Sequence, residues 1–62
     1  MDYFVPIQLQ DLEHYHNMAI WCQQNLGEYK KKWAAVNYQN QMATFVFLRE
    51  EDSELFIQAW IG

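Results

Sequence analysis

Cysteine, glycine and proline are scarce in this sequence of 62 residues. Cys22 is the only cysteine, so no disulfide bond can form within the chain. The only glycines are Gly27 and Gly62, which excludes a glycine-rich loop that could hold a phosphate group. The nitrogen and sulfur donors suited to zinc are His14, His16 and Cys22, fewer than the usual four ligands. We therefore expect neither a bound metal nor a cofactor.

Basic residues are also scarce, with four Lys and Arg against eight Asp and Glu and a net charge of −4. This balance argues against a protein that binds nucleic acid through phosphate contacts, because such proteins need a basic surface. No apolar run approaches the roughly 18 residues of a membrane-spanning helix. Residues 1–6 lack the basic start and cleavage site of a secretory signal. We expect a complete chain that works in the cytoplasm, where a lone thiol stays reduced.

Aromatic residues are plentiful, with three Trp, four Tyr and four Phe. Each such ring can bury about 150–250 Å². A chain this short nevertheless buries only about 60% of the surface that its unfolded form exposes. We expect one domain over residues 1–62, with a dense aromatic core and a partner surface that compensates for the small size.

One helix is predicted over residues 11–26. Apolar residues recur there at spacings of three and four, which places them on one stripe: Leu12, Tyr15, Ala19, Cys22 and Leu26. Asp11 is a suitable N-cap residue, and Gly27 is a suitable residue just beyond the C-terminal end. A second, short helix is predicted over residues 50–60, capped by Asp52 or Ser53.

The rest of the chain predicts extended structure. Residues 33–38 and 42–48 read as two strands of an antiparallel hairpin, joined by a turn at residues 39–41. Residues 3–8 contain Pro6, which removes a backbone donor. We expect an extended arm that lies on the core, with a short edge strand as the alternative. The predicted fold class is α+β.

The hairpin carries more apolar surface than two modest helices can cover. With Gln39 and Asn40 as the loop, Val36 faces Ala43 and Ala34 faces Phe45, and the alternation of each strand defines two faces. One face would remain for a partner, and it is expected to carry Trp33, Met42, Val46 and Leu48. Either the N-terminal arm folds across this face, or another chain does. The unpaired hairpin edges also favour a homodimer through strand pairing.

Two charged clusters are further candidates for contact. The acids at the start of the second helix either dock a basic partner surface or are a solvated helix N-terminus: Glu50, Glu51, Asp52 and Glu54. The only basic cluster, with Trp33 beside it, offers an alternative site for single-stranded nucleic acid: Lys30, Lys31 and Lys32. We favour a solvated connector for the three lysines.

Catalytic chemistry is not expected. His14 and His16 are two residues apart on a helix and point in directions about 200° apart, so they cannot share a site. Cys22 lies on the apolar stripe, as a small core residue does. A core this small also has little room for the roughly 300 Å³ that a substrate pocket needs. We therefore do not expect the chain to be an enzyme.

The chain resembles small bacteriophage-encoded α+β proteins of unassigned activity over residues 20–61. The resemblance lies in the end of the helix at Leu26–Gly27, the strand at Trp33, and a spaced ending made by Phe45, Phe47, Asp52, Phe56 and Trp60. The chain departs from that pattern in having no second basic or cysteine position near the helix end. The resemblance implies a phage accessory protein that acts in an infected cell, and it carries no functional residues.

These observations together predict a small non-enzymatic protein-binding module, in the form of a phage-encoded modulator or inhibitor of a host protein. The expected partner is a second copy of the chain or a host protein. One alternative is a structural or assembly component of a virion or a larger complex. The other is a protein that binds single-stranded nucleic acid.

Overall fold

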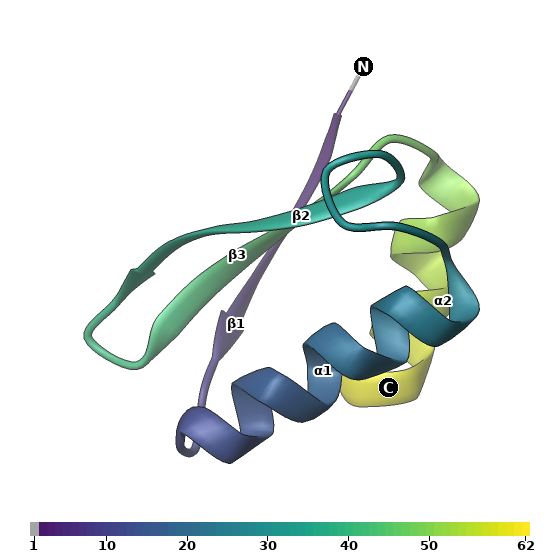
Figure 1. The fold of residues 1–62 in the computed structure, drawn as a ribbon. Coiled ribbons are helices and arrows are strands. Elements are labelled where there is room, and N and C mark those ends of the chain that lie inside the picture. Colours follow the sequence, from purple (N-terminus) through teal and green to yellow (C-terminus); the bar gives the residue numbers. More distant parts are fainter. Residues whose placement is uncertain (1) are drawn as a thin grey trace.

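The computed structural model describes residues 2–62. Along the chain the elements are β1 (Tyr3–Gln8), α1 (Leu12–Asn25), β2 (Trp33–Gln39), β3 (Met42–Phe47) and α2 (Glu50–Trp60). The three strands form one antiparallel sheet in the order β1-β3-β2. Both helices lie on the same side of this sheet (Figure 1). The predicted α+β class is confirmed.

The N-terminal segment is an edge strand, so the alternative is confirmed and the arm lying on the core is wrong. It pairs with β3 along its whole length, from Tyr3 opposite Phe47 to Gln8 opposite Met42. The ladder continues where the Leu9 N–H donates to the Gln41 carbonyl at 2.7 Å.

Pro6 fits this edge because of the phase of the ladder. Hydrogen-bonded residues alternate along an antiparallel strand, so Leu9 and the other odd-numbered residues of β1 bond to β3. The nitrogen of Pro6 therefore faces away from β3, at the free edge. A missing N–H costs no ladder hydrogen bond at that position.

The turn of the hairpin differs from its prediction by one residue. The two loop residues are Asn40 and Gln41, with φ of 54° and 64°, as a type I′ turn requires. Gln39 lies opposite Met42, and the register shifts between Val36 and Gln39. The predicted loop of Gln39 and Asn40 is wrong.

Because of the shifted register, the side chains of β2 that were predicted to face the helices face away from them, and the others face the core. Trp33 lies opposite Phe47 and Ala35 opposite Phe45, so the predicted pairs of Val36 with Ala43 and Ala34 with Phe45 are wrong. Because side chains alternate along a strand, a shift of one residue exchanges the two faces. Trp33 thus enters the core, where it is 4% exposed and its Nε1–H donates to the Gly27 carbonyl at 2.9 Å.

Helix α1 is confirmed with both of its end signals. The Asp11 carboxylate accepts a hydrogen bond from the His14 N–H at 2.8 Å. At the other end, the N–H groups of Leu26 and Gly27 both donate to the Cys22 carbonyl. Gly27 has a φ of 131°, and a Cβ at this position would lie 2.7 Å from the Cγ of Lys32, so another residue there would be strained.

Removing the N-cap is expected to weaken α1. Asp11→Ala leaves a backbone donor of the first turn without its partner, and such losses typically cost about 1 kcal/mol. Urea denaturation followed by circular dichroism measures the difference. Glu13→Ala is the matched control, because Glu13 is an acid in the same turn that makes no cap. Equal losses in the two variants would show that only the charge matters.

Helix α2 begins at Glu50, earlier than the predicted caps imply. The N-cap position is Arg49, which makes no side-chain capping bond. Asp52 and Ser53 lie inside the first turn, where the Ser53 hydroxyl donates to the Glu50 carbonyl at 2.7 Å. The capping role predicted for Asp52 or Ser53 is therefore wrong. Acidic side chains stabilise the positive end of the helix dipole, so Glu50 and Glu51 suit the first turn.

The core fills the space between the sheet and the helices. Phe56 of α2 packs on Phe45 and Phe47 of β3, with ring centroids 4.8 and 5.1 Å apart. Met18 and Cys22 of α1 are fully buried against the same cluster. The inner face of the sheet is thereby closed, and the outer face remains to be accounted for.

Candidate functional site

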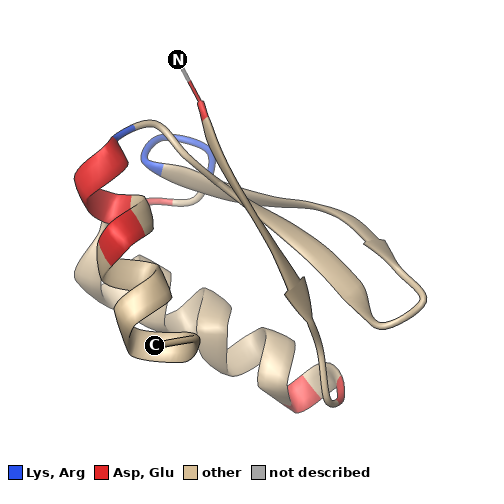
Figure 2. Ribbon diagram, turned by 180° about the vertical axis from the view of Figure 1, so that it is seen from behind, with Lys and Arg blue, Asp and Glu red and all other residues tan. Residues whose placement is uncertain are grey.

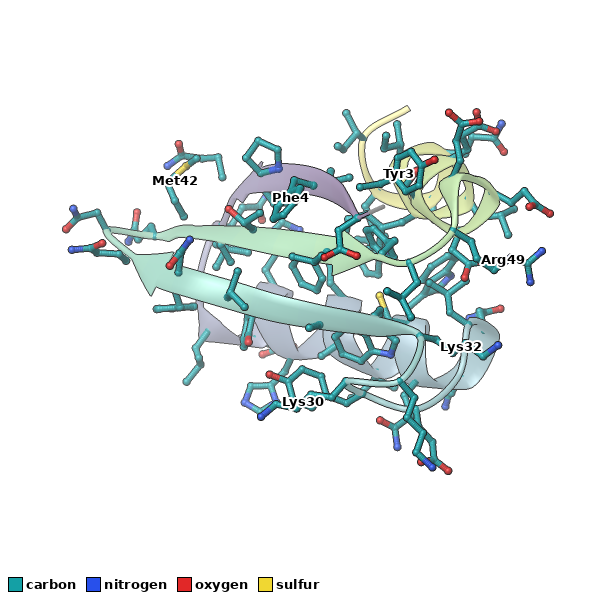
Figure 3. The ribbon with its side chains drawn as sticks, turned by 90° about the horizontal axis from the view of Figure 1, so that it is seen from above. Tyr3, Phe4, Lys30, Lys32, Met42 and Arg49 are labelled. Carbon is teal, nitrogen blue, oxygen red and sulfur yellow. The ribbon has the colours of Figure 1, made fainter. Side chains whose placement is uncertain are left out.

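The outer face of the sheet brings together three strands, of which β1 is distant from the other two in the sequence. We use this name for the residues that point away from the helices: Phe4, Pro6, Gln8, Ala34, Val36, Gln39, Met42, Thr44, Val46 and Leu48. Figure 3 views the sheet from above, with labels on Phe4 and Met42. Phe4 is 63% exposed, Leu48 53%, Val36 40% and Met42 37%. No side chain of this set carries a charge.

Nothing in residues 2–62 covers the outer face. Both helices pack on the opposite side of the sheet (Figure 1). The N-terminal segment, which the sequence allows to fold across this face, instead extends the sheet as β1. The expected excess of apolar surface over what the two helices can cover is present, although its members differ from the predicted set. Met42, Val46 and Leu48 belong to the outer face, whereas Trp33 does not.

The outer face is hollowed near one end. A depression of about 140 Å³ lies over the small side chain of Ala34 and over Val46, bounded by Leu48. Asp2, Lys30 and Lys31 also line it, together with part of Trp33. The hollow exists because Ala34 has only a methyl group at a position where its neighbours across the sheet are larger.

Each edge of the sheet has a feature that hinders pairing with a further strand. Pro6 removes a donor from the free edge of β1. On β2, the preceding loop folds back and forms an isolated bridge between Tyr29 and Trp33. There the Lys30 N–H donates to the Trp33 carbonyl at 2.6 Å, and the Tyr29 hydroxyl to the Ala35 carbonyl at 3.4 Å. The sequence predicts that the free edge of β3 is unpaired, but in the structure β1 pairs with it.

The acidic cluster is divided by the fold. Glu50, Glu51 and Glu54 are exposed, and Glu51 pairs with Arg49 at 2.8 Å. Asp52 is buried instead, which removes it from the predicted contact surface. Burial raises the pKa of the Cys22 thiol to about 12, and the charge of Asp52 adds to this shift. Cys22 is therefore a neutral core thiol at physiological pH.

The three lysines do not form a row suited to phosphates. Lys31 pairs with Glu28 at 3.4 Å, Lys30 lies 5.9 Å from the ring centroid of Tyr29, and Lys32 packs beside Gly27. Figure 2 shows this loop at the same end of the molecule as the acidic first turn of α2. The local charge at that end is therefore mixed.

A groove of about 560 Å³ runs between α1 and the loop before β2, and sequence reasoning missed it. Its walls are aromatic and amide side chains, with one imidazole: Tyr15, His16, Ala19, Ile20, Gln23, Gln24, Tyr29 and Trp33. Burial raises the pKa of Tyr15, and the neighbouring hydroxyls of Tyr29 and Tyr38 add to the effect. The groove lies at the surface and not within the core, so the expectation that a core this small has little room for a pocket, unless subunits combine, stays a prediction.

The groove offers no complete catalytic set. His16 is its only imidazole, and no carboxylate lines it. His14 lies elsewhere: its Nδ1 accepts a hydrogen bond from the Gln10 N–H at 3.2 Å, and its ring packs on Trp60 at 5.9 Å. The predicted separation of the two histidines is confirmed. Within residues 2–62, no group of three His, Cys, Asp or Glu side chains is placed to hold a metal ion.

Comparison with protein-family models, curated proteins and solved structures gives no match for this chain. Neither of the two helices in residues 2–62 has the length and apolar character needed to cross a membrane.

Proposed function

We propose that this chain is a non-enzymatic protein-binding module that acts through the outer face. The observation that carries the proposal is the uncharged and mostly apolar set of strand side chains across all three strands, on which neither helix packs. On a small soluble domain, contiguous apolar surface of this kind marks a site of interaction.

The chemistry of the outer face defines the partner. The backbone groups of β3 are used in ladders on both sides, so the side chains provide the contact. A partner that placed a charge over the centre would bury it without a counter-charge, which is strongly unfavourable. The partner therefore presents an apolar protein surface. Nucleic acid does not meet this requirement, because its phosphates need a row of cations. The strand residues of the outer face carry none, and the two cations at the rim of the hollow, Lys30 and Lys31, lie beside the acidic Asp2.

On the basis of the resemblance to phage proteins, the proposed role of the chain is that of a modulator or inhibitor of a host protein. The exposed acids Glu50, Glu51 and Glu54 lie on α2, on the helical side of the sheet, and would favour partners that reach around to them with basic residues. Such charges at the rim of an interface affect the rate of association and the choice of partner more than the affinity.

Val46→Glu is the test of this function. Val46 lies at the centre of the outer face, between Phe4 and Ala34, so a carboxylate there is expected to abolish capture of the natural partner. Tagged wild type and variant are expressed in the native cell and cross-linked. Proteins lost only with Val46→Glu are identified by mass spectrometry and titrated in pure form.

The matched control is Leu12→Glu, at an exposed apolar residue on α1 that lines neither the groove nor the hollow. It adds the same charge on the helical side of the molecule and is expected to leave capture unchanged. If Val46→Glu retains the same partners as wild type, an untagged copy of the chain included, the outer face is not the binding surface and the proposal fails.

A further inference from the structure

We infer that the partner on the outer face is a second copy of this chain, packed sheet to sheet about a two-fold axis that runs parallel to β3. This inference rests on the proposed function, since it uses the same face. It goes beyond that function by specifying the partner, the direction of the axis and the residues that meet.

Shape is the first argument. Phe4, Val46 and Ala34 form one row across β1, β3 and β2. At one end of the row the ring of Phe4 projects, 63% exposed. The hollow of about 140 Å³ lies over Ala34 and Val46 and extends towards Leu48 and Asp2, beside the row. A cavity of about 150 Å³ is known to hold one benzene molecule. One face therefore carries both a phenyl ring and a hollow of matching size.

Symmetry is the second argument. In a two-fold contact, if residue i of one copy touches residue j of the other, then j touches i. An axis parallel to β3 and above Val46 exchanges the β1 and β2 sides of the sheet. It places Phe4 of each copy over Ala34 of the other, and Val46 over Val46. An axis perpendicular to the strands would instead place Phe4 on Phe4 and leave both hollows empty.

Charge is the third argument, and it selects the same axis. Asp2 precedes β1, whereas Lys30 and Lys31 precede β2, and all three line the rim of the hollow. Phe4 and Lys30 lie on opposite sides of β3 in Figure 3. Asp2 forms no ion pair within residues 2–62. Rotation about the proposed axis brings Asp2 of each copy to the lysine side of the other, so two equivalent ion pairs form at the rim.

The available area is the fourth argument. The chain measures 26 × 22 × 20 Å and exposes 4388 Å². One face of such a nearly isometric body carries about one sixth of that surface, roughly 730 Å². A stable interface buries about 800 Å² from each partner. The whole outer face with its rim is therefore close to what a dimer needs, and two sheets can pack over it at the usual spacing of about 10 Å.

Molar mass in solution tests the dimer. Light scattering on the full chain is expected to give twice the 7.5 kDa of one copy. Ala34→Trp fills the hollow and is expected to return the mass to that of one copy, with an unchanged circular dichroism spectrum. Phe4→Ala is expected to weaken self-association roughly thirtyfold, as removal of a central aromatic anchor does. Leu12→Ala removes a similarly exposed side chain from α1 and is the matched control, which should remain a dimer.

Cross-linking tests the direction of the axis. A mixture of Phe4→Cys and Ala34→Cys proteins is treated with a short bifunctional maleimide, at a protein concentration raised at least thirtyfold to offset the weaker association that loss of the Phe4 ring causes. Linked pairs are expected in the mixture and not with Phe4→Cys alone. Cys22 contributes no background, because its thiol is fully buried and has a raised pKa. Efficient linking of Phe4→Cys to itself would overturn the axis parallel to β3.

The outcomes separate this inference from the proposed function. A wild-type chain that stays monomeric up to millimolar concentration overturns the dimer, while the loss of a different partner with Val46→Glu would still support the function. A dimer that Ala34→Trp and Phe4→Ala do not weaken also overturns the inference. If in addition Val46→Glu retains every partner of the wild type, the proposed function fails with it.

Discussion

Replacing Phe45 with alanine is expected to unfold the chain. Phe45 is fully buried at the centre of β3, with its ring 4.8 Å from Phe56, 6.0 Å from Tyr15 and 6.2 Å from Trp33. Phe-to-Ala changes in a core cost about 3–5 kcal/mol. A domain of this length has a free energy of unfolding of only about 3–9 kcal/mol, so the loss removes most or all of it. Near-ultraviolet circular dichroism and urea denaturation measure the effect.

Leu12→Ala provides the comparison for this result. Leu12 is 58% exposed on α1, and alanine is the better helix former, so its replacement is expected to change the stability by less than about 1 kcal/mol. If Phe45→Ala were to lose no more stability than Leu12→Ala, the stacked aromatic rings would not be the centre of the core.

Raising the pH from 9 to 12 is expected to destabilise the fold through Cys22. Its pKa is about 12 in the folded chain, because of burial and then of Asp52, against an ordinary value of 9.0. A pKa raised by folding contributes stability that is complete below the unfolded pKa and is lost as the pH rises towards the folded one. The loss across this window is at most about 4 kcal/mol. The raised pKa of Tyr15 acts in the same direction.

Urea denaturation at several pH values between 8 and 11.5 measures this slope. Cys22→Ala lacks the thiol and is expected to lose less stability over the same range, although it starts lower because it leaves a small cavity. Tyr15→Phe isolates the contribution of the phenol. If wild type and Cys22→Ala show the same slope, Cys22 titrates normally and its surroundings are more polar than the structure indicates.

The helices could be predicted because their signals are local. Asp11 and Gly27 mark the ends of α1 within the sequence itself, and the apolar stripe between them has the helical period. The bounds of α2, residues 50–60, could be predicted as well, but its cap could not, since Asp52 and Ser53 are of the usual capping types and Arg49 is not. Here the acids of the first turn stabilise an early start.

The sheet could be predicted only in part, because its pairing is not local. Nothing near Pro6 shows that the segment pairs with β3, some 40 residues later, and the phase that tolerates a proline is set by that partner. The register of the hairpin also depended on distant residues. The turn contains no glycine to mark its centre, and the register that forms is the one that buries Trp33 against Phe45.

The sequence predicts that the hairpin has an uncovered apolar surface, but it does not identify all the residues of that surface. An apolar excess on the hairpin follows from composition, and Met42, Val46 and Leu48 were identified from the alternation of β3. Phe4 and Ala34 reach the same face only through β1 and the shifted register. The groove beside α1 combines Tyr15 with Tyr29, which no periodicity connects.

The protected edges of the sheet limit how far assembly can go. A flat sheet with open edges can add strands without end and grow into fibres. Here the ring of Pro6 interrupts one margin, and the Tyr29 loop covers the start of the other. The helices occupy the reverse side, so stacking through the outer face uses up the one remaining surface of the sheet. Growth by strand addition is thus hindered at both edges, which suits a short chain that keeps an apolar surface exposed.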